Sequence, residues 1–66
     1  MSIEVKALYE LPTGQKAMST AYLPEILTDD QLIEVSKNSQ PLWTLIGLLK
    51  FPDGVNQEVV FTRTEQ

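Results

Sequence analysis

Apolar and polar residues alternate with a period of two along the first part of the chain. From residue 3 to residue 11, every odd position is apolar or aromatic, and three of the four even positions are charged. Alternation of this kind is typical of a β-strand that buries one of its faces. The sequence therefore predicts a strand over 3–11.

A turn and a second strand are expected next. Pro12 presets φ for a turn, and Gly14 can adopt a positive φ. Residues 16–23 alternate again, although less regularly, because apolar side chains occur at both odd and even positions. We expect an antiparallel hairpin over 3–23, which Pro24 terminates.

The following segment has the signature of a helix start. Thr28 and Gln31 are spaced as a capping box, in which each side chain accepts a hydrogen bond from the other residue's backbone N–H. Leu27 and Leu32 are spaced as the apolar pair that often packs across such a cap. A short helix over 29–37 is expected, with a basic residue in its last turn and Asn38 as its end.

The densest apolar run covers 42–51 and is compatible with two structures. As a helix, its leucines and isoleucine follow the spacing i, i+3, i+4, i+7. As a strand, it leads directly into the turn sequence 52–54 and then into 57–64, which is rich in strand-forming residues. Gly47 within a helix would cost about 1 kcal/mol relative to alanine, which favours the strand. A helical turn over 41–44 followed by a strand is a third arrangement that fits.

The expected fold class is therefore α+β. The favoured element order is β-β-α-β-β, a small antiparallel sheet of two hairpins with one short helix between them. The alternative order is β-β-α-α-β. Residues 1–66 are expected to form a single domain, because the chain is too short for two, and 63–66 are expected to fray.

The composition narrows the chemistry that this chain can perform. Its 66 residues contain neither histidine nor cysteine. Disulfides, the usual zinc ligand sets and the Ser-His-Asp and Cys-His catalytic arrangements are all excluded on that ground. We expect no enzymatic activity and no cofactor, and we expect the fold to depend on packing or self-association. Residues 1–11 lack the apolar core of a signal peptide, so the expected location is the cytoplasm.

The net charge of −4 is concentrated in one segment. Four acidic residues without an intervening base make up this acidic patch: Glu25, Asp29, Asp30 and Glu34. Elsewhere acidic and basic residues balance. Binding to duplex DNA or to an anionic membrane requires an excess of positive charge, so neither partner is expected. A capped, solvated helix start explains Asp29 and Asp30 without catalysis or metal binding.

If the run over 42–51 is a strand, both of its faces are largely apolar. One face would pack beneath the helix. The other would be exposed in a monomer and would form an interface, since exposed contiguous apolar surface usually marks one. Its candidate residues are Trp43, Leu45, Leu49 and Phe51. The opposing interpretation, in which the run bends and buries itself, stays open.

These features predict a non-enzymatic, acidic protein-interaction module. It would regulate or inhibit a larger protein by occupying part of its surface, and it would form a homodimer. The carboxylates of the acidic patch are expected to bind the partner, in which case binding weakens steeply with salt. Binding that is insensitive to salt would instead indicate the apolar interface that includes Trp43. One alternative is binding of single-stranded nucleic acid on an aromatic sheet face, where bases stack. The aromatic residues available for this are Tyr9, Tyr22, Trp43, Phe51 and Phe61. Another alternative is a small structural subunit of a larger assembly.

Overall fold

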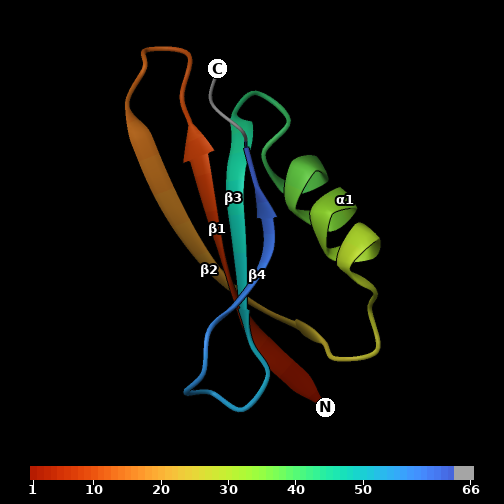
Figure 1. Ribbon diagram of the computed structural model, residues 1–66. Helices are drawn as coiled ribbons and strands as arrows, with labels where there is room; N and C mark the ends of the chain where they lie inside the picture. Colours follow the sequence, from red (N-terminus) through yellow and green to blue (C-terminus); the bar gives the residue numbers. More distant parts are fainter. Residues whose placement is uncertain (64–66) are drawn as a thin grey trace.

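The computed structural model describes residues 1–63 and contains one sheet and one helix (Figure 1). The elements, in chain order, are β1 (Ser2–Glu10), β2 (Lys16–Pro24), α1 (Asp29–Ser39), β3 (Thr44–Phe51) and β4 (Glu58–Thr62). All neighbouring strands are antiparallel, and their order across the sheet is β2-β1-β3-β4. The helix lies against one face of the sheet. This confirms the predicted α+β class and the order β-β-α-β-β.

The first hairpin forms where the alternation predicted it. β1 and β2 pair without interruption from Ser2 opposite Pro24 to Glu10 opposite Lys16. Their connection is closed by two backbone hydrogen bonds, which run from Gly14 N–H to Leu11 O (2.9 Å) and from Leu11 N–H to Gln15 O (2.8 Å). Gly14 has a φ of 91°, a backbone conformation that residues with a Cβ rarely adopt.

The capping box also forms as predicted. The backbone N–H of Gln31 donates to the Thr28 hydroxyl (3.2 Å), and the backbone N–H of Thr28 donates to Oε1 of Gln31 (2.9 Å). The predicted end at Asn38 is wrong, because α1 continues to Ser39 and Gln40 is its C-cap residue. Asparagine is only a weak stop signal, and tertiary packing of the last turn outweighs it.

Most of the apolar run is a strand, but it begins at Thr44 after a turn over 41–43, which is closer to the third arrangement considered above, and its faces differ from strict alternation. A turn closed by Trp43 N–H and Gln40 O (3.2 Å) precedes β3. Within the strand, the register against β1 shifts by one residue, so that Ile46 is an extra residue opposite the Leu8–Tyr9 step. As a result, Leu45 and Leu48 lie on the same face although they are three positions apart. The prediction that they occupy opposite faces is wrong, because the alternation rule assumes an unbroken ladder.

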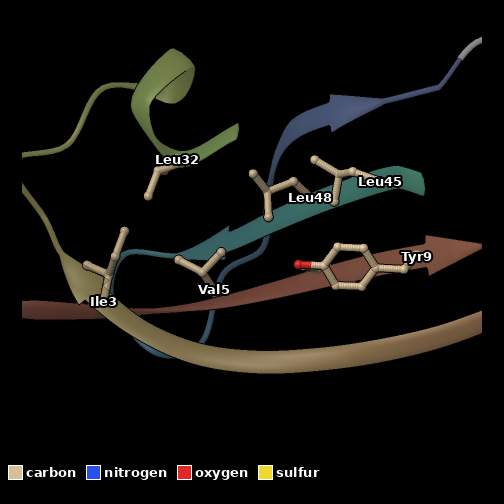
Figure 2. Packing of buried hydrophobic residues seen from close by; sticks show 7 residues of the cluster. Ile3, Val5, Tyr9, Leu32, Leu45 and Leu48 are labelled. Atoms are coloured by element: carbon tan, nitrogen blue, oxygen red, sulfur yellow. The ribbon is translucent and has the colours of Figure 1, made fainter. Parts of the chain in front are cut away.

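The core lies between the sheet and α1 (Figure 2). Its buried residues are Ile3, Val5, Ala7, Tyr9, Leu32, Leu45 and Leu48. Leu32 descends from the helix toward the strands and is fully buried, as is Leu48. The Tyr9 hydroxyl donates a hydrogen bond to the carbonyl oxygen of Ser36 in the last part of α1 (2.9 Å). The core therefore combines apolar packing with one buried hydrogen bond between β1 and α1.

The end of the described chain is tied to the sheet. Arg63 donates its backbone N–H to Ile46 O (2.9 Å), and its guanidinium pairs with Glu10 (2.9 Å). Of the segment 63–66 that was predicted to fray, 64–66 lie outside the described residues. The helix found among residues 1–63 is not long and apolar enough to span a bilayer.

Candidate interaction surfaces

The sheet has one covered face and one open face. Residues directly opposite each other in antiparallel strands project from the same face of the sheet. The odd residues of β1 face the helix, so its even residues and their partners project from the other side. We call this side the open face. Its large apolar side chains are Leu8, Met18, Tyr22, Leu49, Phe51 and Val59.

The apolar side chains of the open face are exposed to very different degrees. Leu8, Leu49 and Phe51 are half-buried by their neighbours in the sheet. Met18 and Tyr22 on β2 are 62% and 70% exposed, because β2 has a neighbouring strand on one side alone. Val59 on β4 is 60% exposed and lies opposite Leu49. The open face therefore offers apolar side chains across all four strands.

Glu4, Lys6 and Glu10 on the open face form ion pairs within the protein, whereas Lys16, opposite Glu10, has no ion pair among residues 1–63. Lys6 lies 3.2 Å from Glu4 and donates a hydrogen bond to the Thr20 hydroxyl (3.3 Å). Glu10 accepts a hydrogen bond from Arg63. This bond and the positive charge of the guanidinium lower the pKa of Glu10. A surface whose charges are mostly paired favours contact with an uncharged partner surface.

The acidic patch is divided in the structure. Asp29 accepts a hydrogen bond from Lys50 of β3 (3.1 Å), and Lys50 also lies 3.7 Å from Glu58. The hydrogen bond with Asp29 and the nearby negative charges raise the pKa of Lys50. Among residues 1–63, the carboxylates of Glu25, Asp30 and Glu34 have no ion-pair partner and are exposed. Asp29 therefore helps to fix α1 to the sheet, while the other three remain at the surface.

The four residues of the predicted apolar interface do not share a surface. Leu45 is 6% exposed and belongs to the core, so its predicted exposure is wrong. Trp43 packs against the same core, with its ring 5.7 Å from that of Tyr9 in an edge-to-face arrangement. Leu49 and Phe51 do lie on the open face. The bulge at Ile46 causes this separation, and a bulge leaves no signal in the apolar pattern.

The contribution of β2 to the open face was predicted in part. Period-two alternation places Met18, Thr20 and Tyr22 on one face of the second strand, and the structure confirms this. The sequence did not indicate that this face would be the open one, because Ala17, Ala21 and the following leucine make the opposite face equally apolar.

The aromatic residues do not assemble into one stacking surface. Tyr9, Trp43 and Phe61 pack on the helix side of the sheet. Tyr22 and Phe51 remain on the open face, on strands that are separated by β1, where Glu4 lies between them. Binding of single-stranded nucleic acid requires successive aromatic rings along a basic groove, and this arrangement does not supply it.

A shallow pocket of about 50 Å³ lies between α1 and the β1–β2 hairpin. Its lining is apolar or carries hydroxyl groups: Val5, Ala7, Tyr9, Ser19, Ala21, Leu23, Val35, Ser36 and Ser39. The lining contains no carboxylate, amine or guanidinium. Over the part of the chain that is described, acidic residues form no cluster of three that could hold a metal ion. The candidate functional features are thus surfaces of the sheet.

Comparison of the chain with protein-family models, with curated protein sequences and with solved structures gives no match.

Proposed function

We propose that this protein is a non-enzymatic interaction module that binds a larger protein through the open face of its sheet. The observation that carries the proposal is the one-sided coverage of the sheet, because α1 packs on one face and the opposite face presents large apolar side chains from four strands. Large apolar side chains exposed together on an uncovered face are typical of protein-binding sites.

The chemistry of the open face indicates the kind of partner. Leu49 and Val59 lie opposite each other on β3 and β4, and the ion pair of Glu4 with Lys6 on β1 lies beside them, with Lys6 opposite Leu49. The complementary surface would be apolar where it meets Leu49 and Val59 and weakly polar beside them. Such binding resists salt, because it depends little on attraction between unlike charges. By covering a functional surface of the partner, the module would act as a regulator or inhibitor.

The proposal is tested by crosslinking at two valines. A photoreactive phenylalanine analogue replaces Val59 on the open face or, as the control, Val55 in the loop between β3 and β4. Both side chains are largely exposed, at 60% and 79%. In cells of the native host, position 59 should crosslink to one defined protein and position 55 should not. The crosslinked protein is then identified and purified.

Binding of that purified protein is measured for Val59→Lys and for the matched Val55→Lys variant. We expect Val59→Lys to weaken binding at least tenfold, Val55→Lys to leave it unchanged, and wild-type binding to persist in 1 M salt, where the Debye length falls to about 3 Å. Loss of wild-type binding at high salt, with equal affinities for the two variants, would instead assign the interaction to the surface carboxylates of Glu25, Asp30 and Glu34.

A further inference from the structure

A second surface of the sheet is available for a different kind of contact. β2 is an edge strand, and Figure 1 shows it on the side of the sheet away from α1. Seven of its nine residues are exposed. The strand is also long and regular, since its register against β1 has no shift over all nine pairs. This edge is therefore an unbroken, accessible row of backbone groups.

The hairpin geometry identifies which backbone groups face outward. In antiparallel strands, pairs that exchange hydrogen bonds alternate with pairs that do not. The bond from Leu11 N–H to Gln15 O sets the phase of this alternation, which continues through Tyr9–Ala17. The intervening β2 residues therefore direct their N–H and C=O groups away from β1. They are Lys16, Met18, Thr20 and Tyr22.

Protective features are few along this edge. Natural edge strands commonly carry a lysine or proline in their middle, a bulge, or a covering loop. Residues 17–23 contain no charge and no proline, and Pro24 comes at the very end. The opposite edge is different, because β4 has five residues, begins with Glu58 and is interrupted by a register shift. Strand addition is thus better suited to β2 than to β4.

We propose that β2 pairs in antiparallel orientation with β2 of a second copy of this chain, with Thr20 opposite Thr20 about a two-fold axis. In this register Met18, Thr20 and Tyr22 of both strands form the hydrogen-bonded pairs, whereas Lys16 lies opposite Pro24, which has no N–H. Met18 of each copy lies opposite Tyr22 of the other copy. Cross-strand pairs that include an aromatic ring stabilise a sheet, and sulfur–aromatic contacts are favourable. The two most exposed apolar side chains of β2 thereby shield each other.

Charge complementarity selects a second copy as the occupant. β2 has Lys16 at its first position and is followed by Glu25 directly after its last. With Thr20 opposite Thr20, Lys16 of one copy lies opposite Pro24 of the other and one position from Glu25, and the two-fold axis creates this arrangement twice. Glu25 has no ion-pair partner within the described chain. The strand is therefore complementary to itself in length, backbone phase and charge.

The expected dimer is weak. One strand pair and its flanking side chains bury less surface than a standard stable interface, which covers about 1,600 Å². We expect the dissociation constant of the dimer to lie roughly in the micromolar to millimolar range. The dimer would join two four-stranded sheets edge to edge and would leave both open faces accessible.

Sedimentation equilibrium tests the position of the contact. The monomer has a mass of 7.4 kDa, and the wild-type chain should approach twice this mass at millimolar concentration. Thr20→Pro removes an outward-facing N–H group, which is where an edge strand tolerates proline. It should stay monomeric with an unchanged circular dichroism spectrum. Val59→Lys, on the opposite edge strand, should still dimerise.

A wild-type chain that stays monomeric overturns the inference. The same holds if Val59→Lys abolishes the dimer and a folded Thr20→Pro variant keeps it, since that result assigns self-association to the open face. Neither result bears on the proposed function, because crosslinking at position 59 to the larger partner is measured independently of dimer formation.

A charge exchange tests the antiparallel orientation. Lys16→Glu and Glu25→Lys should each weaken the dimer roughly tenfold, because each replaces two weak attractions by repulsions. A one-to-one mixture of the two variants should recover the wild-type affinity, since both contacts in the mixed dimer then join unlike charges. A mixture that dimerises no better than its components contradicts the proposed arrangement.

Discussion

β1 and β2 are nine residues long and pair with each other along their whole length, yet they differ in almost every other respect. β1 lies inside the sheet, and Val5 and Tyr9 are almost fully buried beneath α1. β2 lies at the edge, where the residues opposite them, Ala21 and Ala17, are small and more exposed. Equal length and full pairing thus do not give two strands equal roles in the fold.

The difference follows from what lies beside each strand. β1 has a strand on both sides and a helix above it, so its odd side chains lose contact with water. β2 has one neighbouring strand, and its Met18 and Tyr22 project from the open face, whereas its Leu23 packs against the core. We infer that β1 contributes stability and that β2 is free to contribute binding. The predictions below test this division.

The largest expected effect compares apolar truncation in the two strands. Ile3→Ala in β1 should lower the free energy of unfolding by about 2–5 kcal/mol, because it removes buried methyl groups and leaves a cavity. Met18→Ala in β2 should change it by less than about 0.5 kcal/mol, since the side chain is 62% exposed. Urea denaturation, at protein concentrations too low for dimerisation, measures the free energy of unfolding of both variants. Equal losses would show that the two strands contribute alike.

The two tyrosines give a matched comparison of smaller size. Tyr9→Phe removes the hydroxyl that binds Ser36 O and leaves a buried carbonyl without this donor, at a cost of about 1–3 kcal/mol. Tyr22→Phe removes an exposed hydroxyl and should be close to neutral. Because burial raises the pKa of Tyr9, its neutral form is favoured in the folded state.

This linkage gives the Tyr9 comparison a dependence on pH. The stabilisation from the neutral Tyr9 hydroxyl is complete below about pH 10, the pKa of tyrosine in the unfolded chain. It is lost as the pH rises toward the higher pKa that Tyr9 has in the folded state. Wild type and Tyr22→Phe should therefore lose stability in alkaline solution more steeply than Tyr9→Phe. Parallel curves for all three proteins would contradict the burial of the Tyr9 hydroxyl.

Much of the contrast between the strands could be predicted from local sequence. The alternation in β1, the turn at Gly14 and the capping box from Thr28 to Gln31 each depend on residues close together in the chain, and all three form as expected. Local patterns also favoured a strand for β3. They did not determine that β1 would be central and β2 peripheral, because that depends on where the second hairpin docks.

The candidate surfaces were harder to predict for the same reason. The bulge at Ile46 reverses the face on which Leu45 lies, and it arises from the pairing of β3 with β1. The ion pair between Asp29 and Lys50 joins residues 21 positions apart and divides the acidic patch. Neither contact can be derived from spacing along the chain. Exposed surfaces are defined by tertiary pairing, whereas the elements themselves are defined locally.

The connection between the two strands provides the third prediction. Gly14→Ala should destabilise the protein by about 1 kcal/mol, because a residue with a Cβ is strained at a φ of 91°. No atom lies within 4 Å of the added Cβ, so the cost is conformational alone. Gly47→Ala in β3 is the control. Its Cβ would lie 3.6 Å from the Leu8 side chain in ordinary contact, and the variant should be neutral or slightly stabilised.

The smallest expected effect concerns Glu10, the last residue of β1, which faces Lys16 of β2 across the sheet but binds Arg63 on its other side. The Arg63 hydrogen bond and charge lower the pKa of Glu10, so its ionised form is favoured in the folded state. The resulting stabilisation is present above the unfolded pKa of about 4.3 and is lost as the pH falls through the folded value.

The free energy of unfolding of Glu10→Gln should therefore fall less than that of the wild type between neutral and acidic pH. Asp53, whose pKa is lowered by hydrogen bonds from the backbone N–H groups of Asn56 and Val55, contributes to the same acid loss from the loop between β3 and β4. Asp53→Asn should flatten the curve further, and the two effects should add because the groups share no partner. Urea midpoints measured from pH 7 to pH 3 provide the comparison. An unchanged acid slope in Glu10→Gln would mean that the end of β1 is held by backbone pairing with β2 and β3 rather than by Arg63.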